Sequence, residues 1–247
     1  MNRSVLVTGA SRGIGAAVAQ AFAAAGDRVA VHYGSSREAA EKVRASLPGD
    51  GHVLAPADLA DPAQILEMVD GAAAALGGID VLVNNAGIYQ PHRIKDVSYD
   101  EWQQAWSGTL SVNLIGAANV TWCAVRHMSR GGRIVNVSSR GAFRGEPNQP
   151  AYGASKAALV SFGQSLARAL GPDGIAVTTI APGWTDTDMA ADALAGDGYE
   201  RRRLESPLER VADASEVGAA VLYLASPEAE FATGTVLDFN GASHLRM

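Results

Sequence analysis

Apolar runs without polar alternation recur along the chain and predict a sheet that is buried on both faces. Strands of a parallel sheet are covered on both sides, so they are apolar at consecutive positions. Helical stretches separate the runs, which predicts right-handed strand–helix–strand crossovers and a doubly wound α/β sheet. The expected strands are residues 4–8, 29–33, 52–57, 81–84, 133–138, 176–180 and 235–238.

Capping residues predict where four of the helices begin. Asp61 precedes Pro62, which is the order of an N-cap followed by proline at the first helical position. Three further pairs have the spacing of a capping box, in which a short polar side chain and a glutamate bond each other's backbone. These pairs are Ser98 with Glu101, Asp213 with Glu216, and Ser35 with Glu38.

The chain shows no linker and no internal repeat, so residues 1–247 are predicted to form one domain. Two segments are too irregular for the core. Residues 140–151 are rich in glycine and proline, and residues 185–205 follow Pro182-Gly183 and are expected to form a mobile lid over the substrate. Both segments follow strand ends, where open α/β sheets bind ligands.

Composition and charge exclude several classes of protein. The chain has 47% apolar and 19% charged residues, which favours a large core over disorder. Its net charge of −6 argues against a nucleic-acid partner. Cys123 is the only cysteine, so no intrachain disulfide can form, and the five histidines lack metal-ligand spacing. No uninterrupted apolar run reaches the roughly 18 residues of a membrane span, and no signal region is evident, so we expect a cytoplasmic protein without a membrane partner.

A glycine-rich turn follows the first predicted strand, in the sequence Thr8-Gly-Ala-Ser-Arg-Gly-Ile-Gly15. Glycine permits the tight turn, and the helix that follows offers free N–H groups to an anion. A strand before the turn and a helix after it are the context in which this motif binds a dinucleotide pyrophosphate. The expected contacts are Gly9, Ser11, Arg12, Gly13, Ile14 and Gly15.

The residues after the second predicted strand indicate which dinucleotide binds. NAD-binding proteins usually place a carboxylate there to hold the ribose hydroxyls. This chain has His32-Tyr-Gly-Ser-Ser-Arg37 instead, with no carboxylate before Glu38. Hydroxyl groups and a guanidinium favour a 2′-phosphate. We therefore predict NADP(H) rather than NAD(H), with Tyr33, Ser35, Ser36 and Arg12 at the adenosine end.

Three residues have the chemistry and spacing of a carbonyl reductase site. Tyr152 and Lys156, one of only three lysines, lie four residues apart and share a helix face, with Ser139 thirteen residues before the tyrosine. An isolated tyrosine has a pKa of about 10, and a nearby ammonium with a cationic nicotinamide is expected to lower it. Ser139 can polarise a carbonyl oxygen. The pattern predicts hydride transfer to a ketone, with Tyr152 as the proton donor.

Taken together, these motifs make the chain similar to classical short-chain dehydrogenases/reductases. The resemblance covers nearly the whole chain in the family's order, and it implies a single-domain, Rossmann-like, seven-stranded parallel sheet flanked by helices. It also implies a catalytic tetrad of Asn113, Ser139, Tyr152 and Lys156. The residues that carry it are Thr8 to Gly15, Asp58, Asn84 to Gly87, Asn113, Ser139, Tyr152, Lys156, Pro182, Gly183 and Thr187.

The resemblance also implies roles along the cofactor. Asp58 and Leu59 would meet the adenine, and Asn113 would kink its helix and hold a water that relays protons to Lys156. Lys156 would also hold the nicotinamide ribose, beside Tyr152. The remaining implied contacts are Asn85, Ala86 and Gly87 toward the adenosine, and Pro182, Gly183, Thr185 and Thr187 around the nicotinamide.

Within the family the chain is similar to 3-oxoacyl-(acyl-carrier-protein) reductases, which implies a 3-oxoacyl thioester substrate and an acyl carrier protein as a candidate partner. Arg130 matches a docking base of those enzymes, whereas Asp173 stands where a second base often lies. A small free ketone, polyol or secondary alcohol is therefore the alternative substrate. A non-catalytic NADP-binding sensor is disfavoured because the tetrad is complete. The resemblance further implies a homotetramer or homodimer that packs through residues 98–127, 152–170 and 235–242.

Overall fold

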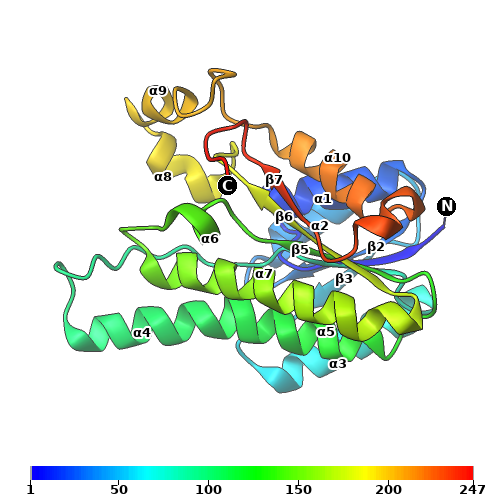
Figure 1. The fold of residues 1–247 in the computed structure, drawn as a ribbon. Helices are drawn as coiled ribbons and strands as arrows, with labels where there is room; N and C mark the ends of the chain where they lie inside the picture. The colour runs from blue at the N-terminus through cyan, green and yellow to red at the C-terminus, as the bar shows by residue number, and fades with distance from the viewer. Residues whose placement is uncertain (1, 247) are drawn as a thin grey trace.

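A seven-stranded parallel sheet forms the centre of the computed structural model, which describes residues 2–246 except the side chain of Asp192. The strand order is β3-β2-β1-β4-β5-β6-β7, which confirms the predicted fold class (Figure 1). The strands are β1 (Ser4–Val7), β2 (Arg28–Tyr33), β3 (Val53–Pro56), β4 (Val81–Asn84), β5 (Arg133–Val137), β6 (Ala176–Pro182) and β7 (Val236–Phe239).

Helices cover both faces of the sheet. The helices α1, α2 and α10 lie on one face, and α3, α4, α5 and α7 lie on the other (Figure 1). The helices are α1 (Gly13–Ala24), α2 (Arg37–Ser46), α3 (Pro62–Leu76), α4 (Tyr99–Leu110), α5 (Ala117–Val125), α6 (Gly141–Arg144), α7 (Pro150–Leu170), α8 (Ala191–Leu194), α9 (Gly198–Arg203) and α10 (Ala214–Leu224).

The first strand shows why the sequence lacks polar alternation. Val5 and Val7 pack with Phe22 on the α1 side, whereas Leu6 packs with Ile65 on the α3 side. Because successive side chains of a strand point to opposite faces, a sheet covered on both sides needs apolar residues at every position. The apolar runs of the sequence are therefore the buried strands themselves.

Three of the four predicted helix starts are confirmed. Asp61 accepts hydrogen bonds from the N–H groups of Ala63 and Gln64, and the capping boxes of Ser98 with Glu101 and Asp213 with Glu216 are both formed. The predicted box of Ser35 with Glu38 is wrong. The turn after β2 needs one more residue, so α2 has Ser36 as its N-cap, without a side-chain capping bond.

One helix corrects the expectation about membrane spans. The helix Tyr99–Val125 contains α4, a π-helical turn (Ser111–Gly116) and α5, and it is long and apolar enough by length and composition to cross a membrane. Its apolar residues are separated by polar ones, so the sequence contains no uninterrupted apolar run that would reveal this helix. One such helix is weak evidence for a membrane span, because core helices of globular proteins pass the same test, and this one packs against α3 and α7.

Ile115 and Trp122 are exposed on the helix Tyr99–Val125, and the expected subunit interface there stays a prediction.

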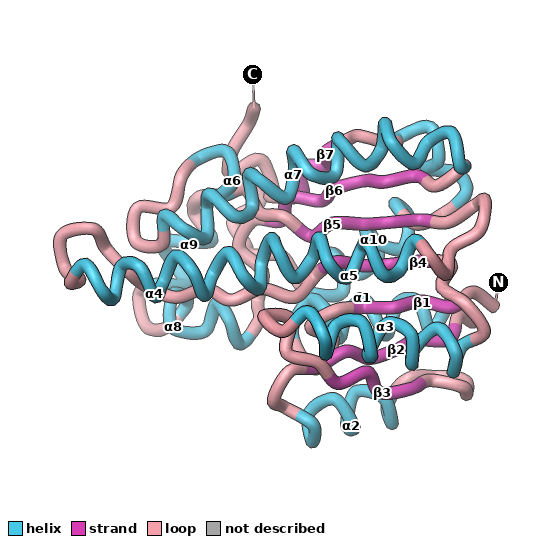
Figure 2. Tube along the Cα trace, turned by 90° about the horizontal axis from the view of Figure 1, so that it is seen from below, coloured by secondary structure: helices cyan, strands magenta, loops and turns pink. Residues whose placement is uncertain are grey.

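The strand order changes direction between β1 and β4, because β2 lies outside β1 and β5 lies outside β4. In open α/β sheets the crevice at such a point, beyond the carboxyl ends of the strands, is where ligands bind. Figure 2 shows α6, α8 and α9 at the same end of the sheet. The loops that carry the predicted motifs therefore meet there.

Candidate functional site

A cavity of about 940 Å³ runs along the carboxyl ends of the strands. It brings together almost all of the residues that the sequence predicted for the site. Those on its wall are Gly9, Ser11, Arg12, Gly13, Ile14, Gly15, Ser35, Ser36, Asp58, Leu59, Asn85, Ala86, Gly87, Ser139, Tyr152, Lys156, Pro182, Gly183, Thr185 and Thr187. Tyr33 and Asn113 are the two predicted residues that do not line it.

The glycine loop is held tightly against the end of β4. Gly9 has a φ of +63°, and a Cβ there would lie 2.8 Å from the Cα of Ala86. The Asn85 Nδ2 donates to the carbonyl oxygens of Thr8 and Gly9, at 2.9 and 3.2 Å. The Thr8 hydroxyl accepts from the N–H groups of Asn85 and Ala86. These contacts fix the conformation of the loop.

The start of α1 offers an anion site at this loop. Its N-cap residue, Arg12, makes no side-chain capping bond, and its first turn has no acidic residue. The first N–H groups of a helix have no partner inside the helix and carry positive potential. The loop and the helix therefore fit the pyrophosphate of a dinucleotide.

His32 positions the glycine loop, and it was not among the residues that the sequence predicted for the site. Its Nδ1 accepts from the N–H of Gly9 at 2.8 Å, so its Nε2 carries the proton and donates to the Ala57 oxygen at 3.2 Å. Burial lowers the pKa of His32 to about 4, which keeps the ring neutral and able to accept. A polar residue inside an apolar strand was the signal that could have found it.

The expectation for Tyr33 is wrong for a reason of strand geometry. Since side chains alternate across a strand, His32 faces the glycine loop and Tyr33 faces the opposite layer. Tyr33 is 6% exposed and packs in the core with the residues of α1 and α2. It therefore supports the sheet instead of contacting the adenosine end.

The adenosine end of the cavity carries the charges that distinguish the two dinucleotides. Ser35 and Ser36 line it after β2, and the described wall has no carboxylate on that turn. Asp58 lines the neighbouring wall, where its Oδ1 accepts from the Ala60 N–H at 2.9 Å. Arg12 is exposed there, and within residues 2–246 its side chain makes no hydrogen bond or ion pair. Its guanidinium is thus free to meet an anion.

Tyr152 and Ser139 meet at the centre of the cavity wall. Tyr152 lies in the first turn of α7, and Ser139 follows the end of β5. The Ser139 hydroxyl lies close enough to Tyr152 to lower its pKa, against the opposite effect of burial. The Ser139 Oγ also accepts from the N–H of Gly141 at 3.0 Å, which fixes its position. A carbonyl oxygen at this point would face two hydroxyl groups.

Lys156 is buried one turn further along α7. Its Nζ donates to the Val137 oxygen at 2.8 Å and lies 5.7 Å from the centre of the Tyr152 ring. Burial lowers the pKa of Lys156 to about 8. Burial also raises the pKa of Tyr152 above its usual value, and the nearby Ser139 hydroxyl offsets this only in part. The expected lowering of the Tyr152 pKa is therefore wrong for the groups of the protein itself, because desolvation outweighs its neighbours.

Asn113 lies behind the wall, in the π-helical turn between α4 and α5. Its Oδ1 accepts from the N–H of Ile88 at 2.8 Å, and its Nδ2 donates to the Ile88 oxygen and the Ser155 Oγ. A Cβ at Gly87 would lie 3.4 Å from both the Asn113 Oδ1 and the Lys156 Nζ, so the two side chains approach each other there. Single π-helical turns are frequent at functional sites. The water relay through Asn113 stays a prediction.

The cavity wall also contains residues that were not among the predicted site residues. Trp184 lines the cavity, and its Nε1 donates to Glu205. Glu205 also accepts from Arg140 and Arg202, so it ties the predicted lid segment, residues 185–205, to the loop after Ser139. Further residues on this wall are Ile88, Tyr89, Arg140, Glu146 and Met189. Several of them belong to the two segments that sequence reasoning identified only as irregular.

Known proteins resemble the chain over nearly its full length. A family model described as enoyl-(acyl carrier protein) reductase matches residues 9–244. A 3-oxoacyl-(acyl-carrier-protein) reductase of Staphylococcus aureus is 35% identical and covers 99% of each chain. The enzyme of the same name from Salmonella typhimurium is 36% identical, over 97% of this chain and 96% of its own.

Solved structures agree with these sequence relatives. A short-chain dehydrogenase from Burkholderia cenocepacia, in complex with NADP, is 40% identical with a TM-score of 0.90, over 98% of this chain and 97% of its own. A blue fluorescent protein from a metagenomic library, in complex with NADPH, is 34% identical with a TM-score of 0.89 over the same shares of the two chains. Likeness of this extent, together with the motifs above, shows that the chain belongs to the short-chain dehydrogenase/reductase family of oxidoreductases.

Proposed function

We propose that the protein is an NADPH-dependent reductase of ketones. The observation that carries this proposal is the placement of Tyr152, Ser139 and Lys156 together on the wall of a cavity that also holds the glycine loop. NADPH, when bound, would supply the hydride. Its phosphates would lie at Gly9 to Gly15, and its nicotinamide would lie near Lys156 and Thr187. The complexes of related proteins with NADP and NADPH support this choice of cofactor.

In this proposal Ser139 orients the carbonyl oxygen and Tyr152 donates the proton to it. A phenol whose pKa is raised by burial stays protonated near neutral pH, which suits proton donation in the reductive direction. Lys156 would hold the ribose and return a proton to Tyr152, since its own pKa of about 8 lies near the working pH. Asn113 would position the route by which that proton reaches Lys156.

Arg12→Ala is expected to raise the Kd for NADPH about 10- to 100-fold and to leave the Kd for NADH nearly unchanged. A hydrogen bond to a charged group contributes about 1.5–3 kcal/mol, and NADH lacks the 2′-phosphate that Arg12 would meet. Fluorescence titration measures both constants. The matched control is Arg37→Ala, which removes a nearby guanidinium that is bonded to Glu41 at 2.8 Å. An equal loss for both cofactors, or a wild type that prefers NADH, would contradict the assignment.

A 3-oxoacyl thioester is the first candidate substrate. The similarity to 3-oxoacyl-(acyl-carrier-protein) reductases supports it, and so does the exposed Arg130, whose Nη2 donates to the Pro172 oxygen at 3.0 Å. Arg130 would meet acidic groups of an acyl carrier protein. Asp173 directly follows Pro172 on the same loop. Its carboxylate would repel an acidic partner, and this weakens the case for an acyl carrier protein.

A free ketone or polyol is the second candidate, and a specific observation favours it. The wall around Tyr152 includes the polar side chains of Tyr89, Arg140 and Glu146. An unbranched acyl chain has no use for these groups, whereas a hydroxylated ketone can bond them. A small substrate also needs no docking surface for a carrier protein.

A substrate screen tests the proposal and separates the two candidates. NADPH consumption would be measured with acetoacetyl thioesters, with crotonyl thioesters and with free ketones and sugars. We expect ketones to be reduced and crotonyl thioesters to be untouched, because Tyr152 and Ser139 act on an oxygen and not on a carbon–carbon double bond. A higher kcat/KM for acetoacetyl thioesters supports the first candidate, and the reverse order supports the second. If no ketone is reduced, ketone reduction is the wrong function.

A further inference from the structure

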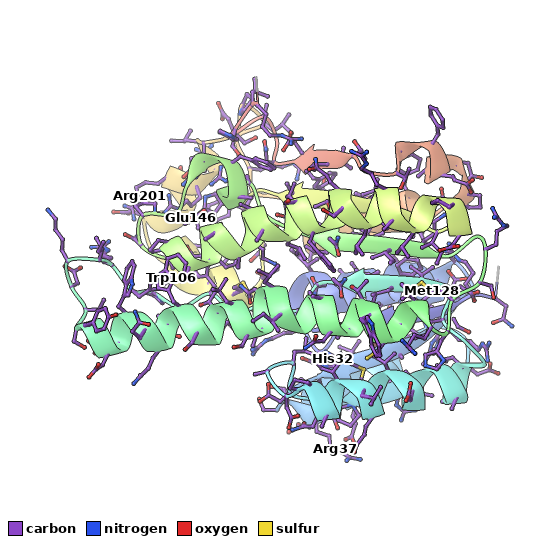
Figure 3. The ribbon with its side chains drawn as sticks, turned by 60° about the horizontal axis from the view of Figure 1, so that its bottom comes forward. His32, Arg37, Trp106, Met128, Glu146 and Arg201 are labelled. Atoms are coloured by element: carbon purple, nitrogen blue, oxygen red, sulfur yellow. The ribbon has the colours of Figure 1, made fainter. Side chains whose placement is uncertain are left out.

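Glu146 lines the same cavity as Tyr152 but has no part in the proposed reaction. It lies in the turn between α6 and α7, on the side of the molecule where the lid carries Arg201 (Figure 3). A Cβ at Gly141 would come 2.4 Å from the Glu146 Oε1, so the carboxyl lies flat against that glycine. Gly141 in turn bonds the Ser139 hydroxyl. The carboxyl is therefore placed next to the residue that holds Ser139.

The Glu146 carboxyl has no partner within the described part of the chain. None of its oxygens takes part in a hydrogen bond or an ion pair between residues 2 and 246, although the side chain is half-buried. Burial raises its pKa, as expected for a carboxyl that is withdrawn from water. Its oxygens are not among the fully buried ones, so a substrate that covers them would displace water, at a cost in free energy unless it bonds the carboxyl in return.

The surrounding charges indicate from what kind of group this carboxyl would accept a hydrogen bond. The guanidinium groups of Arg144, Arg140 and Arg202 all act on Glu146 through space, and Glu205 is the single nearby carboxylate opposing them. All three arginines are bonded to Glu205, so they hold their positions. An ammonium group would meet this excess of positive charge and be repelled. An uncharged hydroxyl would not.

A second polar side chain lies on the same side of Tyr152. The ring of Tyr89 meets the ring of Tyr152 edge-on, with 4.9 Å between their centres, and Glu146 acts electrostatically on both phenols. Tyr89 and Glu146 therefore form a polar rim next to the point where the carbonyl oxygen would lie. An alkyl group pressed against this rim would leave the carboxyl buried without a partner.

We propose that Glu146 is a specificity residue that accepts a hydrogen bond from a hydroxyl group carried by the substrate close to its carbonyl. The inference rests on the proposed ketone reduction, and it selects hydroxylated free ketones from the candidate substrates. Sites built to bond a substrate hydroxyl discriminate strongly against analogues without one, because the buried group of the protein then stays unpaired.

Matched ketones test this directly. Hydroxyacetone and butanone differ by a hydroxyl in place of a methyl group, and 4-hydroxybutan-2-one and pentan-2-one place the same change one carbon further out. For the wild type we expect kcat/KM to favour the hydroxylated member of at least one pair by about tenfold or more, which corresponds to one hydrogen bond. Glu146→Leu should bring that ratio close to one, mainly through KM. Glu146→Gln, which keeps an acceptor oxygen, should retain most of it.

NADPH titration of each variant shows whether it is folded, and Glu146→Ala repeats the test if the leucine variant fails to bind cofactor. A ratio that is the same in the wild type and in a cofactor-binding Glu146→Leu or Glu146→Ala overturns the inference. A wild type that reduces acetoacetyl thioesters but neither hydroxyketone also overturns it, and leaves ketone reduction intact. A wild type that reduces no ketone at all overturns both.

Discussion

Replacing Tyr152 by phenylalanine is expected to lower kcat for ketone reduction by about 10²- to 10⁴-fold, which is the usual contribution of a positioned general acid. The substitution removes one hydroxyl and keeps the ring, so the edge-on contact with Tyr89 remains. Lys156 keeps its bond to the Val137 oxygen because that contact does not involve Tyr152. Steady-state NADPH consumption gives kcat, and fluorescence titration gives the cofactor affinity, which should change little.

Tyr89→Phe is the matched control for this substitution. It removes a phenolic hydroxyl from the same wall, next to Tyr152, but from a residue to which we assign no proton transfer. Its effect on kcat should stay below about tenfold, the size of one lost hydrogen bond. A Tyr152→Phe variant that turns over like the wild type, or a Tyr89→Phe variant that is equally impaired, would show that the proton comes from elsewhere.

The features that sequence predicted well are those that depend on local pattern. The apolar runs predicted the strands because burial on both faces demands apolar residues at each position, as Val5, Leu6 and Val7 show. The capping box of Ser98 with Glu101 depends on residues three apart, and spacing alone specifies it. The placement of Tyr152 and Lys156 on one face of α7 likewise follows from helical periodicity.

The features that sequence missed depend on where a side chain points and on what surrounds it. The sequence predicted a cofactor contact at Tyr33, but successive side chains of a strand point to opposite faces, and His32 is the residue of β2 that holds the glycine loop. The pKa of Tyr152 depends on burial, which no spacing reveals. The contacts of Glu205 join segments 61 to 65 residues apart in the chain, and irregular segments carry no periodic signal that could have predicted them.

Gly15→Ala is expected to raise the Kd for NADPH by at least about 100-fold, since the loss of two loop N–H bonds to the pyrophosphate, at about 1.5 kcal/mol each, costs that much. A Cβ at residue 15 would lie 2.2 Å from the Gly9 oxygen and 2.5 Å from the Asn85 Nδ2. Both atoms belong to the contacts that shape the pyrophosphate loop, because Asn85 donates to the Thr8 and Gly9 oxygens. The loop and α1 must therefore move apart, and we also expect a loss of about 1–3 kcal/mol in the free energy of unfolding.

Gly71→Ala separates this steric effect from helix propensity. Gly71 lies inside α3, as Gly15 lies inside α1, but a Cβ there would meet no atom within 4 Å. Alanine favours a helix interior by about 1 kcal/mol over glycine, so Gly71→Ala should stabilise the fold and leave the Kd for NADPH unchanged. Thermal unfolding and fluorescence titration measure the two quantities on both variants. The two variants make the same chemical change and differ only in the space around it. If Gly15→Ala also bound NADPH like the wild type, the close approach of α1 to Gly9 would therefore not be what shapes the cofactor site.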